Sequence, residues 1–179
     1  IKVQDDVPEA KQGEEVPANL NLTLILDKSG SMSNEINFDQ ASGVARITAL
    51  TTAVSSLLST LDASAAENIR VHLVSYDTNA YDLGTYDIKV NGQGGIELSA
   101  AQNALALGTG GYTNYEAGYQ QALAWIDPAY AGVQPIQAGD VTGDLVNQVI
   151  FFSDGDPNKY NDPDQGDPGG PDADPNGNS

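Results

Sequence analysis

Hydrophobic residues along the chain alternate between short runs typical of strands and longer stretches with helical spacing. The first run is nearly continuous and rich in β-forming residues, as in a buried central strand, and the last run is also predicted to be a buried strand. The helical stretches place apolar residues three and four positions apart, so that they share one face. The predicted strands are 20–26, 69–76, 83–90 and 146–152, and the predicted helices are 45–61, 98–107 and 115–126.

The order of these elements predicts the fold class. Strand, helix, strand, strand, helix, helix and strand indicate an open, mostly parallel, doubly wound α/β sheet with helices on both faces, of Rossmann-like type. A short Asp/Thr/Asn turn joins the second and third strands, which therefore form an antiparallel hairpin. Residues 127–144 read as a loop insertion. In sheets of this kind ligands bind beyond the carboxyl ends of the strands.

Composition divides the chain into three parts. Residues 1–19 are acidic, contain two prolines and resemble an interdomain linker. Residues 20–156 form the predicted domain, and 157–179 are rich in Asp, Pro and Gly, as in a loop or disordered tail. We expect a piece of a longer protein, with neighbouring domains of the same chain as contacts. No apolar run approaches the ~20 residues of a membrane helix, so no direct membrane insertion is expected.

Charge and cysteine content narrow the functional classes. The net charge is -18, from 25 acidic and 7 basic residues, which argues against nucleic acid and anionic membrane surfaces as partners. The same balance favours cations. The chain has no cysteine, which excludes disulfides and thiolate metal sites.

One polar cluster follows the first predicted strand. Asp27, Ser29 and Ser31 alternate on a tight loop, and their oxygens are the ligands that hard divalent cations prefer. Asp154 comes directly after the last strand and Thr113 directly before a helix, so three loops are expected to converge. The five side chains carry at most two negative charges, so we expect the cation to take one more anionic ligand, a carboxylate from a protein or another ligand. The sequence does not choose between Mg²⁺, Ca²⁺ and Mn²⁺.

These residues resemble the metal-ion-dependent adhesion site of von Willebrand factor type A and integrin I domains. The match consists of LILDKSGSM at 24–32, Thr113 within GYTNY and Asp154 within VIFFSDG, and the resemblance covers about 20–156. It implies serines that bind the metal directly, and a threonine and aspartates that bind it directly or through water. The acidic linker, missing cysteines and Asp-rich tail are similar to large bacterial surface adhesins of the RTX type. That likeness implies an extracellular role in adhesion and biofilms.

The sequence departs from that family after the final aspartate. Family domains continue with about two strands and a helix, whereas nothing apolar follows Phe152 here. We therefore expect an apparently truncated fold with strand 146–152 near an edge. The helix-shift activation of the family cannot be carried over.

Two weaker candidate sites remain. Asp172, Asp174 and Asn176 have the opening spacing of a calcium loop, which indicates a possible additional Ca²⁺, with a solvated linker as the competing interpretation. Tyr112 and Tyr115 flank Thr113 and are candidates for the rim of a ligand site, with packing as their alternative role.

Other functions compete with the adhesive module. A calcium-stiffened spacer in a long surface protein fits the same sequence. A magnesium-dependent phosphatase with Asp27 as nucleophile needs a second aspartate two residues later, where Ser29 stands, so we expect no catalytic residues and no enzyme. An intracellular type A domain that works with a motor ATPase is disfavoured by the acidic linkers.

Overall fold

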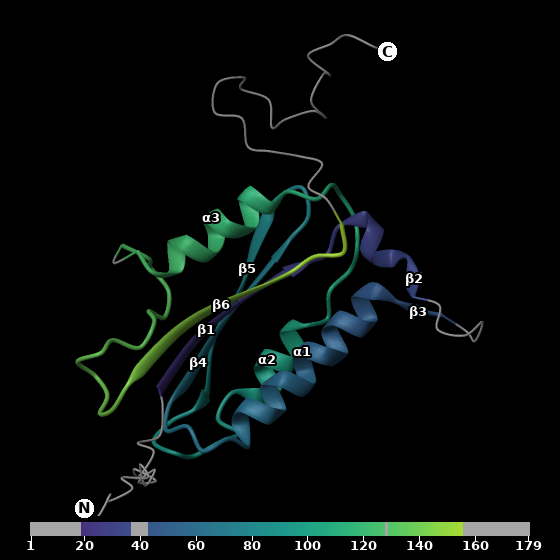
Figure 1. The fold of residues 1–179 in the computed structure, drawn as a ribbon. Coiled ribbons are helices and arrows are strands. Elements are labelled where there is room, and N and C mark those ends of the chain that lie inside the picture. The colour runs from purple at the N-terminus through teal and green to yellow at the C-terminus, as the bar shows by residue number, and fades with distance from the viewer. Residues whose placement is uncertain (1–18, 37–42, 128, 156–179) are drawn as a thin grey trace, which may run out of the picture.

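A four-stranded sheet with helices on both faces forms the centre of the computed structural model, which describes residues 19–36, 43–127 and 129–155 (Figure 1). The strand order is β5-β4-β1-β6, and a separate two-stranded ribbon pairs β2 with β3. Apart from Asn19, the predicted linker and tail lie outside the described residues. The elements are β1 (Asn19–Asp27), the 3-10 helix η1 (Gly30–Ser33), β2 (Glu35–Ile36), β3 (Val44–Ala45), α1 (Arg46–Asp62), β4 (Ile69–Tyr76), β5 (Ala80–Lys89), α2 (Leu98–Ala104), α3 (Tyr115–Trp125) and β6 (Leu145–Phe152).

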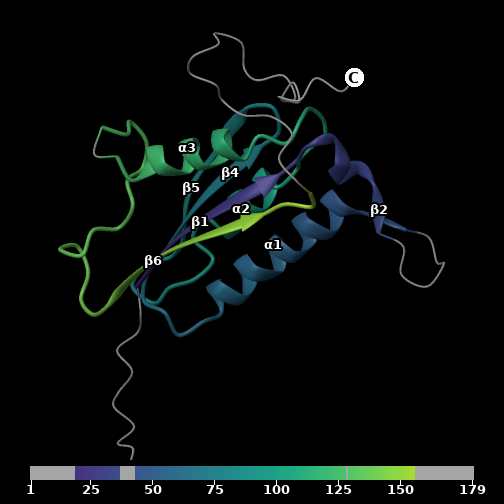
Figure 2. The same cartoon turned by 45° about the horizontal axis from the view of Figure 1, so that its top comes forward.

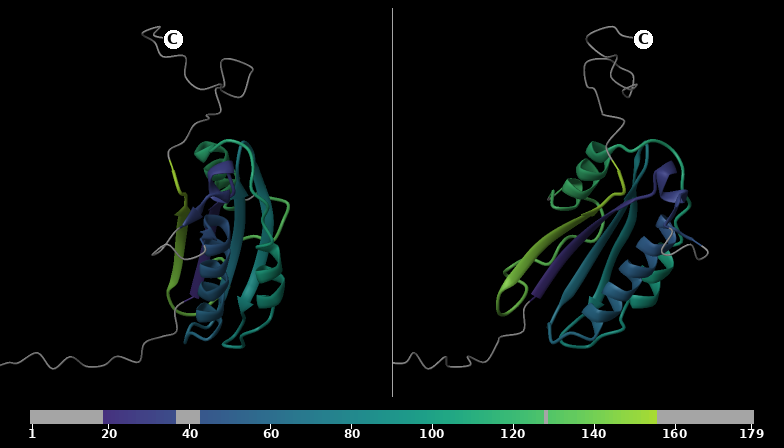
Figure 3. Two further views of the ribbon diagram at one scale, coloured as in Figure 1. Left: turned by 90° about the vertical axis from the view of Figure 1, so that its right-hand side faces the viewer. Right: turned by 45° about the vertical axis from the view of Figure 1, so that its right-hand side comes forward.

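The topology confirms the predicted fold class. Strand β1 pairs in parallel with both β4 and β6, and β4 and β5 form the expected antiparallel hairpin. Helices α1 and α2 cover one face of the sheet and α3 covers the other, as the right-hand view of Figure 3 shows. No described helix has the length and apolar character to cross a membrane.

Alternate side chains of β1 enter two separate hydrophobic clusters. The larger cluster lies under α1 and α2, and the smaller one lies under α3. This division follows from the two-residue period of a strand, which sends neighbouring side chains to opposite faces. The larger cluster includes Leu22, Leu24, Leu26, Val54, Leu58, Val71 and Leu73, and the smaller consists of Ile25, Val74, Tyr76 and Ala122.

A buried asparagine on the α3 side of β1 holds the loop of residues 127–144. The Asn21 side chain accepts a hydrogen bond from the backbone N–H of Ile136 at 2.9 Å and donates one to the Ile136 carbonyl at 2.9 Å. It also donates to Asn147 Oδ1 on β6 at 2.9 Å. One side chain thus joins the central strand, an edge strand and the loop.

Strand β6 is more exposed than the sequence predicted. Its apolar run indicated a buried strand, yet Val149 is 59% exposed and only the last three residues of β6 pack against the core. The reason is its position at the edge of the described sheet, where it pairs with β1 alone. The expectation of an edge position therefore agrees with the structure, and the expectation of full burial was wrong.

Two loops cross at the carboxyl end of the sheet. The turn after β1 lies beside the segment between α2 and α3 (Figure 2), and Gly30 donates its N–H to the Gly111 carbonyl at 3.1 Å. Gly110 donates in return to the Lys28 carbonyl at 2.9 Å. These reciprocal backbone hydrogen bonds fix the position of the turn that carries the candidate site residues.

Gly111 is required at this crossing. Its φ of 74° lies in the left-handed region, and an added Cβ would lie 2.8 Å from Thr78 Oγ1. We expect Gly111→Ala to destabilise the protein by about 1–3 kcal/mol. Gly110→Ala is the matched control, because a Cβ there meets nothing within 4 Å. Urea unfolding of both variants is the measurement, and equal effects would contradict the strain argument.

The single histidine is part of the core and not of the candidate site. His72 is fully buried in β4, stacks on Trp125 with ring centroids 4.9 Å apart, and lies 3.3 Å from Asp82 through Nε2 and Oδ1. Burial lowers the pKa of His72 from its ordinary value of 6.5, and the nearby Asp82 opposes this only in part. The imidazole is therefore neutral in the folded protein near pH 7.

This lowered pKa predicts a pH dependence of stability. The unfolded chain binds the His72 proton more tightly, so the contribution of neutral His72 is complete above pH 6.5 and declines as the pH falls toward the lowered pKa. His72→Phe keeps a flat ring against Trp125 and removes this part of the decline. Unfolding free energies of both proteins between about pH 5 and 8 provide the measurement. Parallel curves for the two proteins would refute the assignment.

Candidate functional site

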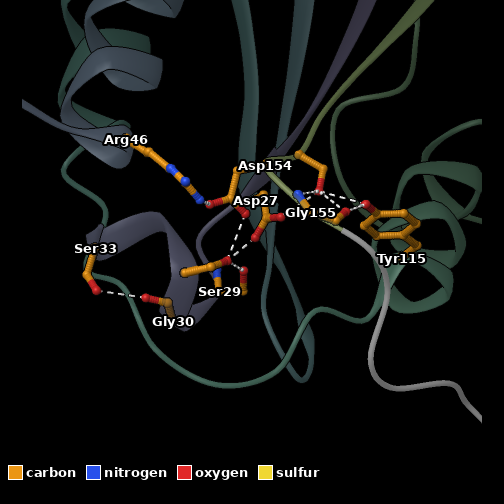
Figure 4. A network of polar contacts seen from close by, with 10 residues as sticks. Asp27, Ser29, Gly30, Ser33, Arg46, Tyr115, Asp154 and Gly155 are labelled. Carbon is orange, nitrogen blue, oxygen red and sulfur yellow. Dashed lines mark hydrogen bonds and ion pairs between the residues drawn. The ribbon is translucent and has the colours of Figure 1, made fainter. Parts of the chain in front are cut away.

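The Asp27 carboxylate is held in place by hydrogen bonds to both of its oxygens. Asp27 is the last residue of β1 and is completely buried. Its Oδ1 accepts the backbone N–H of Ser29 at 2.8 Å, and its Oδ2 accepts the hydroxyl of Ser153 at 2.9 Å (Figure 4). Each carboxylate oxygen thus has a donor that sets its direction.

The two serines of the turn connect to the second aspartate. Ser29 Oγ lies 3.2 Å from Ser31 Oγ, and Ser31 Oγ donates to Asp154 Oδ1 at 2.7 Å. The turn is anchored by Met32, whose side chain is buried in the 3-10 helix. The structure therefore brings together four of the five residues predicted from the sequence.

Thr113, the fifth predicted residue, is buried at 4% exposure on the neighbouring loop. It lies two residues after Gly111, where that loop contacts the turn. The cap of α3 is provided by the next residue, because Asn114 Oδ1 accepts the N–H of Ala117 at 3.1 Å. The residue that caps α3 is therefore Asn114.

Two residues of the site were missed by the sequence reasoning. Arg46, the first residue of α1, forms an ion pair with Asp154, with Nη1 2.6 Å from Oδ2. Nothing in the local sequence distinguishes this arginine. Ser153 could have been found, because it stands between the end of a strand and a predicted ligand, Asp154.

The tyrosines beside Thr113 have different environments. Tyr112 is 55% exposed, and its backbone N–H donates to Thr78 Oγ1 at 3.0 Å. Tyr115 packs edge-on against Phe151 with centroids 4.8 Å apart, and its hydroxyl lies 2.8 Å from Ser153 Oγ. Tyr115 therefore helps to fix the position of the Ser153 hydroxyl. The candidate calcium residues Asp172, Asp174 and Asn176 lie outside the described residues.

Tyr76, which lies opposite Asp27 on β4, is buried next to this aspartate. Burial raises the pKa of Tyr76 well above its ordinary value of 10.0, and the negative charge of Asp27 contributes to the increase. The hydroxyl therefore stays protonated, and it donates to the Phe152 carbonyl at 3.3 Å. This hydrogen bond connects β4 to the end of β6.

The spacing of the side-chain oxygens is compatible with a small hard cation. Six ligands placed octahedrally at ~2.1 Å from a centre are about 3.0 Å from their neighbours. The separations of 3.2 Å from Ser29 to Ser31 and 2.7 Å from Ser31 to Asp154 lie on either side of that value. Within the described ranges no cluster of three or more His, Cys, Asp or Glu could hold a metal, so any cation here depends on hydroxyl ligands.

A family profile and solved structures place the chain among known proteins. The family profile of the von Willebrand factor type A domain matches residues 22–156, which is well over half of the chain. The comparison with curated protein sequences finds no match.

Solved structures share the fold at low sequence identity. The PilB minor pilin from Streptococcus sanguinis has a TM-score of 0.56 at 20% identity and covers 79% of this chain and 31% of its own. The pilus adhesin SpaC from Lactobacillus rhamnosus GG has 0.55 at 20%, with 82% and 16% covered. The von Willebrand factor domain of the type V pili tip protein Mfa5 from Porphyromonas gingivalis has 0.54 at 17%, with 81% and 40% covered.

The chain therefore spans less than half the length of each of these three proteins. Their likeness concerns the fold, which agrees with the parallel β4-β1-β6 core described above. Apart from the first three residues of β1, the family match covers the strands of the main sheet and the loops at their carboxyl ends. This chain belongs to the von Willebrand factor type A domain family.

Proposed function

We propose that this domain is a metal-ion-dependent protein-binding module of an extracellular bacterial adhesin. Asp27, Ser29, Ser31, Thr113 and Asp154 hold one divalent cation, which is Mg²⁺, Ca²⁺ or Mn²⁺. Bound there, the cation supplies one open coordination position for a carboxylate of a protein partner. The observation that carries the proposal is the linked row of oxygens from Ser29 through Ser31 to Asp154, which join two loops remote in sequence.

Charge at the site favours an acidic ligand. Two carboxylates faced by the Arg46 guanidinium do not neutralise a dication, so surplus positive charge is left at the turn. Elsewhere the chain is strongly acidic, with a net charge of -18, and repels a carboxylate. Attraction is thereby confined to the one edge of the sheet that holds the cation.

The protein's own groups prepare the site before any partner arrives. Ser29 N–H and Ser153 Oγ fix Asp27, and Arg46 fixes the outer oxygen of Asp154. Ligands held in this way lose little conformational freedom on binding a cation. The setting outside the cell and the adhesive role draw support from the pilus adhesin and pilin structures that share the fold.

Metal binding is tested first by a matched pair of serine variants on the turn. We expect Ser31→Ala to weaken Mg²⁺ or Mn²⁺ binding by at least about tenfold, because it removes a ligand. Ser33→Ala is the control, since Ser33 Oγ donates to the Gly30 carbonyl in the same turn without facing the carboxylates. Calorimetric titration of the two variants is the measurement, and equal affinities would exclude Ser31 as a ligand.

Carboxylate capture is tested with two capped peptides that differ in one group, Gly-Asp-Gly and Gly-Asn-Gly. With Mg²⁺ present we expect the Asp peptide to shift the backbone amide NMR signals of residues 29–31 and 110–113. We expect the Asn peptide to shift them far less, because an amide carries no charge for the cation. Chelation of the metal should abolish the difference. A response to both peptides that survives chelation would show that the metal does not hold the ligand.

A further inference from the structure

A cleft of about 500 Å³ lies next to the metal turn and is separate from the row of oxygens. Its volume falls within the range of about 300–1,000 Å³ typical of ligand pockets. It is formed where the carboxyl end of β4 and the beginning of β5 meet the segment that follows α2. Its principal lining residues are Lys28, Ser75, Asp77, Tyr81, Leu83 and Leu107, and glycines of the 108–111 loop form its edge.

Ser75 lines this cleft, and its buried hydroxyl is unsatisfied. It continues the face of β4 on which Val71 and Leu73 enter the larger hydrophobic cluster. The residue is 1% exposed, and its Oγ has no hydrogen-bond partner among the described residues. Burial of a hydroxyl without a partner costs free energy, so an apolar residue would be favoured here for stability alone. A hydroxyl at this position is therefore suited to a hydrogen bond with an outside group.

The two charged groups of the cleft, Lys28 and Asp77, neutralise each other's charge. Lys28 forms an ion pair with Asp77, and its ammonium lies 4.2 Å from the centroid of the Tyr81 ring. Asp77 Oδ1 also accepts the N–H of Asn79 at 3.0 Å and the Tyr81 hydroxyl at 3.2 Å. The carboxylate thus accepts three hydrogen bonds from the protein, whereas an ammonium has three N–H donors of its own. A neutral occupant suits this arrangement better than an ion.

Apolar walls complete the description of the occupant. Leu83 and Leu107 line the cleft beside the polar groups, so it accepts an aliphatic stem as well as a polar end. A carboxamide on such a stem could accept a hydrogen bond from Lys28 and donate one to Ser75. A glutamine or asparagine side chain has this chemistry.

The position of the cleft links it to the metal turn. Lys28 stands between Asp27 and Ser29, and Gly110 and Gly111 contact the turn through their backbones. We propose that the cleft binds the carboxamide side chain of a residue next to the acidic residue that the turn captures. The inference rests on the proposed function for the acidic residue, and the cleft would give the module specificity beyond a bare carboxylate.

Ser75→Ala tests the cleft, with Ser56→Ala on the exposed face of α1 as the control. The probes are capped peptides Gly-Asp-Gln-Gly and Gly-Gln-Asp-Gly, each compared with its leucine counterpart in the presence of Mg²⁺. We expect the preferred Gln peptide to bind the native protein and Ser56→Ala about fivefold more tightly than its Leu counterpart. Ser75→Ala should lose this preference and unfold at an unchanged or higher urea concentration, because its hydroxyl has no internal partner to lose.

A metal-free arm separates the two proposals. N-acetylglutaminamide has no carboxylate, so with chelator present it probes the cleft alone, and we expect it to shift the amide signals of Ser75 and Leu107 in the native protein only. If the peptides fail to bind but these shifts occur, the cleft binds a carboxamide as proposed, whereas capture of an acidic residue at the metal turn fails. Equal affinity for Gln and Leu peptides, absent shifts, or an unchanged preference in Ser75→Ala would overturn the cleft proposal.

Discussion

The parallel pairing of β1 with both its neighbours is the constraint on which the candidate site depends. In this register Asp27 lies opposite Tyr76 of β4, and Leu26 lies opposite Phe152 of β6. Three strands thus end at one level, and the residues that follow them meet without long connections. A slip of one residue would send the Asp27 side chain to the other face of the sheet and separate it from Ser153. The two-sided burial of β1 excludes such a slip.

Local patterns were enough to predict most of the fold. Apolar runs and helical spacing identified the strands of the main sheet and all three α-helices, because each of these patterns depends only on residues close together in the sequence. The short β2–β3 ribbon and the exposure of β6 were not predicted, since they depend on which segments of the chain pack beside these strands. The same division applies to the site: Asp27, Ser29 and Ser31 are adjacent in sequence, whereas Arg46 reaches Asp154 only through the placement of α1.

Basic residues are scarce in this chain, and two of the 7 lie at this edge of the sheet. Arg46 pairs with Asp154, and Lys28 pairs with Asp77. Both cations lie beside carboxylates that would otherwise repel each other where three strand ends converge. The pairs are partly shielded from solvent, so salt screens them less than it screens exposed pairs. The acidic character of the surface is thereby kept compatible with a tightly folded edge of the sheet.

The anchoring role of Asn21 has a consequence for producing the protein. Asn21-Leu22-Thr23 has the sequence of an N-glycosylation acceptor, and both nitrogen and oxygen of the Asn21 amide are occupied inside the fold. A sugar attached during secretion from a eukaryotic host would have no room between β1 and the loop at Ile136. Chains modified in this way could not close that loop over the sheet, so a bacterial host or an Asn21-sparing change at Thr23 is the appropriate route to homogeneous material.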